Sequence, residues 1–467
     1  MTFRDDFLWG AATAAYQIEG AARVEGRGDS VWDMVCRRPG FVERGETGDD
    51  ACDHYHRWAE DIAIMKEMGL RSYRFSISWP RVLPGGVGAI NEPGLAFYDR
   101  LVDALREADI EPLVTLFHWD FPTALFDRGG WLNPESPEWF ADYTRLVVDR
   151  LSDRVSWWLT LNEPQCFIGL GHLTGVHAPG LQLPLDRVLL AGHHALLAHG
   201  RAVQTIREHA RTPATIGYAP VGHVCYPDTE SAADIEAARM RTFEPDNTDP
   251  NSNWRMFNWS WWADPVLEGR YPESYLEHYG DAAPPRTDAE MRIISEPVDV
   301  LGFNLYQGAR VRAGADGRPE AVAHAVGHAR TSMGWPIAPD ALYWALRFYS
   351  ERHSTPMLIT ENGRANPDVV SDDGRVRDVI RIDYLAKYLR CMRRAVEEGI
   401  DLRGYCCWSL MDNFEWAHGY AQRFGLVYVD YETKNRTIKD SGRWYTRVVE
   451  TNGASLDEPI DAPLAAV

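Results

Sequence analysis

Two glutamates in similar sequence contexts are the strongest candidates for chemistry. Glu163 closes an apolar run in the segment TLNEP, and Glu361 closes another in ITENG. Two carboxyl groups in one cleft suit glycosidic bond cleavage, because one can protonate the leaving oxygen while the other attacks or stabilises the anomeric carbon. Either segment alone is also an ordinary strand exit, since Asn-Gly and Glu-Pro both favour turns. Together they predict a catalytic pair, in which one negative charge raises the pKa of the acid partner.

Further polar side chains follow other apolar runs and suit the same chemistry. A cationic Arg74 near Glu361 would keep that carboxylate ionised, and Tyr306 could donate a hydrogen bond to it. Asn162 lies beside Glu163 in the sequence and could contact the sugar 2-hydroxyl. The remaining candidates at these positions are Gln17, His118, Trp119, Asn304, Trp408, Glu415 and Trp416.

The elements that must position these residues are eight apolar or β-branched runs that alternate with amphipathic stretches. Most runs are too apolar to have a wetted face, which is typical of a parallel sheet covered on both sides. From Tyr98 to Ala108, apolar residues recur at offsets 0, 3, 4, 7 and 10, which predicts one face of a helix. The predicted strands are Leu8–Thr13, Leu70–Ile77, Ile110–Phe117, Val155–Asn162, Ala214–Pro220, Val298–Tyr306, Pro356–Gly363 and Leu402–Leu410.

Eight strands that alternate with helices predict a single α/β domain, a (β/α)8 TIM barrel. A doubly wound open sheet is the rival, but the segment WGAATAAYQIEG does not carry the Gly-rich phosphate turn after its first strand. The barrel is expected over residues 1–453, with a flexible C-terminal tail over 454–467. Elaborated βα loops are predicted at Glu25–Asp50, Gly169–Leu185 and Tyr226–Trp262, on the rim where barrels place their sites.

The composition excludes several classes of protein. The net charge is −20 and 45% of residues are apolar, as in ordinary globular proteins. No membrane-spanning helix is expected, because no run of about 18 apolar residues occurs. A surface this acidic would repel nucleic acid. The first residues carry Asp5 and Asp6 where a secretory signal needs an apolar stretch. The seven cysteines, odd in number and without a C-x-x-C motif, predict buried free thiols and a cytoplasmic protein.

No metal ion or cofactor is expected. His54 and His56 are two residues apart, and His193 and His194 are adjacent, so neither pair has the i, i+4 spacing of a helical zinc motif. The His-Glu-x-x-His, Gly-x-Ser-x-Gly and Walker motifs are absent from the sequence.

Tryptophan is unusually frequent, with 18 Trp against 16 Phe. Sugars have flat C–H faces rimmed by hydroxyl groups, so an aromatic-rich acidic chain hints at carbohydrate. One aromatic cluster has two readings, as plain core packing or as a wall at the mouth of the cleft. It consists of Trp254, Phe257, Trp259, Trp261 and Trp262.

Motifs along nearly the whole chain, from Phe7 to Val448, resemble those of the glycoside hydrolases of family 1, the β-glucosidase family. The matching segments are FLWGAATAAYQIEGA, YRFSISWPR, FHWDFP, TLNEP, LGFNLY, ITENG and WSLMDNFEWAHGYAQRFGLVYVD. The resemblance implies a retaining double displacement without a cofactor, with Glu163 as acid/base and Glu361 as nucleophile. It implies sugar contacts at Gln17, His118, Trp119, Asn162, Tyr306, Trp335, Trp408, Glu415, Trp416 and Phe424, and support of the nucleophile by Arg74, Asn304 and Tyr306.

Some positions depart from the family pattern. Leu305, Pro336 and Arg364 replace residues common in the family, which leaves the aglycone preference open. Members that cut phosphorylated sugars carry Ser and Lys after the eighth strand, whereas this chain has Glu415 and no Lys before Phe424. We therefore expect an exo-acting β-glucosidase for small neutral β-glycosides such as cellobiose and aryl or alkyl β-glucosides, with some β-galactosidase or β-fucosidase activity. A 6-phospho-β-glucosidase, a transglycosylase and a non-catalytic sugar-binding barrel remain as alternatives, and the oligomeric state is open.

Overall fold

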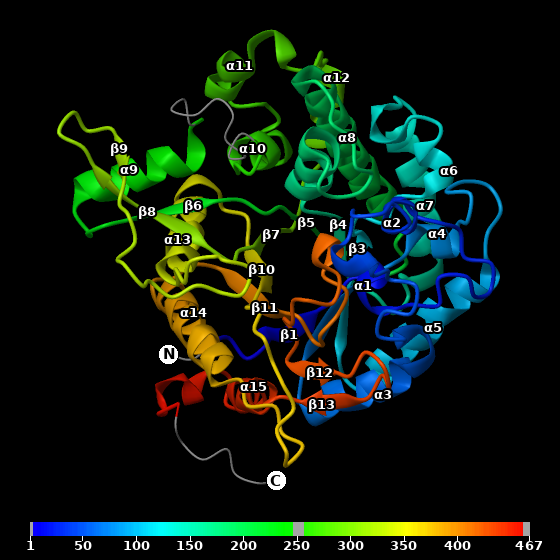
Figure 1. Cartoon of the computed structure of the whole chain (residues 1–467). Coiled ribbons are helices and arrows are strands. Elements are labelled where there is room, and N and C mark those ends of the chain that lie inside the picture. The colour runs from blue at the N-terminus through cyan, green and yellow to red at the C-terminus, as the bar shows by residue number, and fades with distance from the viewer. Residues whose placement is uncertain (1–2, 246–255, 461–467) are drawn as a thin grey trace.

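Eight parallel strands close a barrel in the order β1-β11-β10-β7-β5-β4-β3-β2, and helices surround it (Figure 1). The computed structural model describes residues 3–245 and 256–460. Strand β1 completes the ring, because it pairs with β11 on one side and with β2 on the other. The predicted (β/α)8 TIM barrel is confirmed.

Each barrel strand lies within one of the predicted apolar runs, so all eight predicted strands are confirmed. Their interiors are almost entirely buried, as expected for a parallel sheet covered by helices. The strands are β1 Leu8–Ala12, β2 Ser72–Ser76, β3 Glu111–Phe117, β4 Trp157–Asn162, β5 Thr215–Ala219, β7 Val300–Asn304, β10 Met357–Asn362 and β11 Leu402–Trp408.

The helices bury one apolar face against the barrel. Helix α5, Glu92–Glu107, buries Tyr98, Leu101, Val102 and Leu105, the face predicted from their spacing. The other long helices are α3 His54–Glu67, α7 Ser136–Leu151, α8 Leu185–His209, α13 Asp340–Arg352, α14 Val379–Glu397 and α15 Asp440–Glu450. Short helices are α1 Ala15–Ile18, α2 Val31–Cys36, α4 Trp79–Val82, α6 Thr123–Phe126, α10 Ser260–Glu268, α11 Glu273–Tyr279 and α12 Asp288–Ile294.

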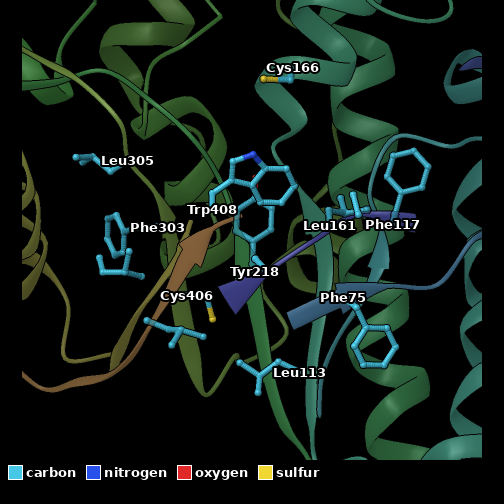
Figure 2. Close-up of a cluster of buried hydrophobic side chains, with 14 of the residues drawn as sticks. Phe75, Leu113, Phe117, Leu161, Cys166, Tyr218, Phe303, Leu305, Cys406 and Trp408 are labelled. Atoms are coloured by element: carbon cyan, nitrogen blue, oxygen red, sulfur yellow. The ribbon is translucent and has the colours of Figure 1, made fainter. Parts of the chain in front are cut away.

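The core continues from the barrel strands to the segments beyond their ends. Figure 2 shows buried side chains from β2, β3, β4, β5, β7 and β11. Trp408 lies at the tip of β11, and Cys166 lies beyond the strand ends, in the π-helix η3 Gln165–Thr174 (Figure 2). The barrel core therefore extends beyond the carboxyl ends of the strands into the segments that carry the candidate site.

The segment predicted as a long loop over Tyr226–Trp262 is not a plain loop. It contains helix α9, Ala232–Phe243. The helix is capped by Ser231, whose side chain accepts a hydrogen bond from the backbone N–H of Asp234. Strand β6, Val224–Pro227, pairs with the hairpin of β8 and β9, Gly308–Ala313 and Pro319–Ala321. The segment after β5 is therefore an elaborated βα segment, as predicted, and its helix was missed because the apolar stripe of α9 is weak.

The two other predicted rim loops also contain structure. Helix α2 interrupts Glu25–Asp50, with a capping box between Ser30 and Asp33. The segment Gly169–Leu185 begins inside η3. A small hairpin, β12 Val427–Val429 and β13 Arg436–Ile438, follows the eighth strand.

The predicted flexible tail begins too early. Residues Ala454–Asp457 form the 3-10 helix η7, in which Leu456 is buried and accepts a hydrogen bond at its carbonyl from Arg390 Nε at 2.8 Å. The prediction of a flexible tail is therefore wrong for these residues, because an apolar contact and a backbone hydrogen bond fix them. Residues 461–467 lie outside the described residues. Within residues 3–245 and 256–460, the structure has no helix with the length and apolar character needed to cross a membrane.

Candidate active site

A pocket of about 410 Å³ opens at the carboxyl ends of the barrel strands and gathers the predicted site residues. Four of them, Gln17, Arg74, Asn162 and Asn304, are buried and hydrogen bonded to one another or to the groups that line the pocket. Those that line it directly are His118, Trp119, Glu163, Tyr306, Trp335, Glu361, Trp408, Glu415, Trp416 and Phe424.

Glu361 is held by a cation and a hydroxyl group. It lies near the end of β10, where its backbone pairs with Asn304 of β7. Arg74 Nη1 lies 2.7 Å from its Oε1, and the Tyr306 hydroxyl donates to its Oε2 at 2.6 Å. The carboxylate is therefore fixed at both oxygens. Two residues later, a Cβ at Gly363 would lie 1.7 Å from the Trp408 carbonyl oxygen, so only glycine fits where β10 and β11 end.

Glu163 has a different setting. It follows β4 with a left-handed backbone (φ +49°), and its N–H donates to the Ala219 carbonyl of β5 at 2.8 Å. Asn304 Nδ2 donates to its Oε1 at 2.7 Å. Burial, and next the negative charge on Glu361, raise the pKa of Glu163 to about 8. The acid is therefore protonated near neutral pH.

The two carboxyl groups divide one proton unequally. Burial raises the pKa of the Glu361 carboxyl, and the Arg74 cation and the Tyr306 hydroxyl oppose this by stabilising its ionised form. Glu163 has no ion pair of its own and accepts only from neutral donors among the contacts that the structure describes. A single proton on the pair therefore lies on Glu163, and the charge lies on Glu361.

A buried hydrogen-bond network joins five strands behind the two glutamates. Asn162 Oδ1 accepts from Arg74 Nη2 at 2.6 Å and from Asn304 Nδ2 at 2.9 Å. Thr360 donates to Asn304 Oδ1 at 2.6 Å, and Thr115 accepts from Arg74 Nε at 3.0 Å. Because β2, β3, β4, β7 and β10 each contribute a member, small shifts of one strand are resisted by the others.

Polar atoms at the inner end of the pocket are left without hydrogen-bond partners among the residues that the structure describes. Gln17 Nε2 donates to the Phe414 carbonyl at 2.8 Å and lies 3.4 Å from Glu415 Oε2, while its Oε1 is buried and unpaired. Asn162 Nδ2 lies 3.1 Å from His118 Nε2, and His118 Nδ1 is also buried and unpaired. Burial, then the charges on Glu361 and Glu163, raise the pKa of Glu415 to about 8. Unpaired buried groups cost free energy, so this end is prepared for a hydroxyl-rich ligand.

Aromatic rings form the remaining walls. The rings of His118 and Trp408 stack with centroids 5.7 Å apart, and Trp119 and Trp416 lie 4.5 Å apart. Flat aromatic faces of this kind pack against the C–H faces of sugar rings. The rings of Trp335 and Tyr306 lie 5.2 Å apart, so Trp335 adjoins the residue that donates to Glu361.

The aromatic cluster of residues 254–262, predicted either as core packing or as a wall of the cleft, contains residues of both kinds. Trp259, Trp261 and Trp262 are fully buried core residues, and Phe257 lines the pocket. Trp254 lies outside the described residues.

Several pocket residues escaped the sequence reasoning. They come from the segments after β4, β5, β7 and β11, and the quoted motifs contain few of these positions, although His418 lies within the last of them. The predicted rim loop at 169–185 was the available signal for three of them. They are Cys166, Leu170, Val176, His177, Val221, Gly222, His223, Gln307, Met333 and His418.

One group of possible metal ligands lies apart from the pocket. Ligand atoms of Asp264, Glu268 and His353 lie within 4.8 Å of one another. Arg352 Nη2 already contacts both carboxylates, at 2.9 and 3.0 Å. The guanidinium group therefore supplies the positive charge there.

Comparisons with known proteins agree with this geometry. The model of glycosyl hydrolase family 1 matches residues 1–454. A β-glucosidase A of Thermotoga maritima is 45% identical over 97% of this chain and 98% of the relative, and a bifunctional β-D-glucosidase/β-D-fucosidase of Bifidobacterium breve is 39% identical over 97% and 99%. A solved structure of a family 1 β-glucosidase from Thermotoga maritima superposes with a TM-score of 0.87 at 44% identity, covering 97% of this chain and 99% of the other. The chain therefore belongs to glycosyl hydrolase family 1, whose β-glucosidases hydrolyse O-glycosidic bonds.

Proposed function

We propose that this chain is a retaining exo-β-glucosidase that releases terminal non-reducing β-D-glucosyl residues from neutral β-glucosides, including cellobiose and aryl or alkyl β-glucosides. One observation carries the proposal. Glu361 and Glu163 line one pocket, and among the described residues only Glu361 of the two has an ion pair, with Arg74 Nη1 2.7 Å from its Oε1. The pair therefore offers a charged nucleophile and a protonated acid at the same time, as a double displacement requires.

In the first step, the Glu361 carboxylate attacks the anomeric carbon while the bond to the leaving oxygen breaks. Glu163 gives its proton to that oxygen, which departs as an alcohol and leaves a glycosyl ester on Glu361. Esterification removes the negative charge of Glu361, so the pKa of Glu163 falls and the group becomes a base. Glu163 then takes a proton from water, the water oxygen bonds to the anomeric carbon, and Glu361 leaves as a carboxylate.

The inner end of the pocket supports exo action on an unmodified sugar. Trp416 and Glu415 line this end of the pocket, and the buried Gln17 lies behind them, with its Nε2 3.4 Å from Glu415 Oε2. A carboxyl group at this position accepts hydrogen bonds from the 4- and 6-hydroxyl groups and repels a 6-phosphate once it is ionised. The family relative named for both glucosidase and fucosidase activity supports a side activity on β-fucosides, and a β-galactoside differs only at the 4-hydroxyl.

The test is a panel of aryl β-glycosides and cellobiose with the purified protein. We expect turnover of the β-glucoside, weaker turnover of the β-galactoside and β-fucoside, and β-glucose as the first anomer seen by proton NMR. Preference for the glucoside 6-phosphate would instead favour a phospho-β-glucosidase. Transfer of glucose mainly to sugar rather than to water would favour a transglycosylase. No turnover of any glycoside would favour the non-catalytic sugar-binding barrel.

The cysteines support a reducing, cytoplasmic compartment. All seven are free thiols, and six of them are buried. Mass spectrometry of protein from its native host should find no disulfide, and several disulfides would overturn this assignment.

A further inference from the structure

Two tyrosines on helix α14 contact the backbone beside the nucleophile, and the mechanism above does not use them. Tyr384 and Tyr388 lie one helical turn apart, both are fully buried, and their rings stack with centroids 4.1 Å apart. Their hydroxyl oxygens both lie close to the backbone carbonyl oxygen of Tyr306, at 3.3 Å for Tyr384 and 3.0 Å for Tyr388. Tyr306 is the residue whose own hydroxyl donates to Glu361 Oε2 at 2.6 Å.

The direction of these two hydrogen bonds follows from the other neighbour of each hydroxyl group. The Tyr384 hydroxyl accepts from Asn362 Nδ2 at 3.0 Å. The Tyr388 hydroxyl accepts from the Ala338 N–H, also at 3.0 Å. A hydroxyl group has one proton, so with an N–H on its acceptor side that proton is directed to the Tyr306 carbonyl. Burial raises the pKa of both tyrosines, so both stay donors in alkaline solution.

These bonds fix a part of the chain that lies outside the strands. Tyr306 is in the short link between β7 and β8. Tyr384 also ties this link to β10, because Asn362, which donates to its hydroxyl, directly follows Glu361. One buried hydroxyl group therefore joins the residue after the nucleophile to the residue that donates to the nucleophile.

We propose that Tyr384 and Tyr388 are positioning residues for Tyr306: their hydroxyl groups hold its backbone in the place from which its phenol donates to Glu361. The inference rests on the proposed role of Glu361 as nucleophile. The phenol hydroxyl lies at the far end of the Tyr306 side chain, so a small tilt of the backbone displaces it by a larger distance. A misplacement of about 1 Å can remove much of the effect of a catalytic contact.

The Tyr306 hydroxyl is one of several groups that set the charge of Glu361. It stabilises the ionised form, so its loss or displacement should raise the pKa of the Glu361 carboxyl. The ring of Tyr306 also packs against Trp335 and Phe424, with centroids 5.2 and 6.2 Å away, so loss of the backbone bonds should displace the phenol only in part. The other charged or titratable groups that act on Glu361 are Arg74, Glu163, Cys166, Cys406 and Glu415. None of these groups is altered by a substitution at Tyr384 or Tyr388.

The experiment measures kcat/KM for an aryl β-glucoside against pH and follows the acid limb, the fall of kcat/KM at low pH. Glu361 must be ionised to attack, so this limb should move to higher pH when the Tyr306 hydroxyl is lost or displaced. Tyr306→Phe should move it by about one unit, and the double variant Tyr384→Phe/Tyr388→Phe by roughly half a unit. Tyr445→Phe is the matched control, because it removes a buried hydroxyl that donates from α15 to the Gly10 carbonyl of β1 at 2.9 Å. It should leave the limb in place.

A double-mutant cycle separates positioning from a general loosening of the fold. When both α14 substitutions are added to Tyr306→Phe, the limb should move no further, because the hydroxyl that they position is gone. The two single α14 variants should give smaller shifts in the same direction, and they provide the test if thermal melting shows that the double variant does not fold. An unmoved limb in the folded α14 variants or in Tyr306→Phe would overturn the inference. An equal shift in Tyr445→Phe, or the same added shift in the Tyr306→Phe background, would also overturn it.

Glu361→Gln separates these outcomes from failure of the proposed function. Turnover in Glu361→Gln with the acid limb unchanged would show that the limb does not belong to Glu361, and the nucleophile assignment itself would fail. If Glu361→Gln is inactive, the limb moves in the α14 variants, and Tyr306→Phe abolishes that further shift, then Tyr384 and Tyr388 position Tyr306 as proposed.

Discussion

Two buried polar regions involve the segment after β11, and their charges are paired differently. In the first, Asp412 accepts from Arg423 Nη1 at 2.7 Å, Lys439 Nζ at 2.6 Å and the Gly425 N–H at 2.9 Å. Lys439 Nζ also contacts Asp368 at 2.6 Å. The second region is the pocket, which holds three acidic side chains, and Arg74 is the one direct ion-pair partner that the described residues give them.

The difference separates charges that hold the fold from charges that do chemistry. Burial alone would raise the pKa of Asp368, but Arg381 and Lys439 outweigh it and hold that pKa below its usual range. In the pocket, the pKa values of Glu163 and Glu415 reach about 8, because burial and the charges of neighbouring glutamates raise them, and the Arg74 cation, which pairs with Glu361, only partly opposes this at Glu163. Perturbed and partly unpaired groups of this kind mark functional sites.

Removal of the nucleophile should have the largest effect. Glu361→Gln should reduce turnover of an aryl β-glucoside by ~10⁴-fold or more, because the amide cannot form the glycosyl ester. Initial rates by absorbance measure this, with Asp373→Asn on the surface as a control that keeps full activity. Substantial activity in Glu361→Gln would show that the reaction does not need the Glu361 carboxylate. The distinction between charges that hold the fold and charges that do chemistry would then fail.

Removal of the acid should depend on the leaving group. Glu163→Gln should slow cellobiose and alkyl glucosides by about 10²–10⁴-fold and should slow dinitrophenyl glucoside much less, because a good leaving group departs without a proton. Rates over a series of aryl glucosides of graded leaving-group pKa measure this. Equal losses across the series would contradict the acid role.

The paired region should respond in stability first. Lys439→Met leaves Asp368 and Asp412 each short of one cation, and should lower the free energy of unfolding by about 3–5 kcal/mol. Urea unfolding measures this change. Lys387→Met breaks an exposed pair with Asp383 and should cost less than about 1 kcal/mol. A loss in Lys439→Met no larger than that of this control would show that the buried network does not stabilise the fold.

The smallest expected effect concerns the alkaline limb of the pH profile, the fall of kcat/KM at high pH. Glu163 acts as an acid only while protonated, so kcat/KM should fall as pH rises through about 8. The pKa of Glu415 lies in the same range, so a variant must show which of the two glutamates causes the alkaline limb. In Glu415→Gln the limb should remain, although sugar binding weakens. Disappearance of the limb in that variant would assign it to Glu415 instead.

The strands and the two glutamates could be predicted because their signals are local. A buried parallel strand is an apolar run, and a polar residue that ends it must point toward the rim. Contacts between distant segments could not be predicted in this way. Lys439 meets Asp368 across 71 residues, and nothing near either residue in the sequence marks the pair. Spacing alone likewise could not separate Phe257, in the pocket wall, from Trp259 and Trp261 in the core.

The most direct test of the account is to trap the covalent intermediate. A 2-deoxy-2-fluoro-β-glucoside with a good leaving group slows hydrolysis of the ester more than its formation, so the labelled protein can be digested and mapped by mass spectrometry. The account predicts one fluorosugar per chain, attached to Glu361, and no label in Glu361→Gln. A label on Glu163 or on any other residue, or inactivation without a covalent sugar, would contradict it.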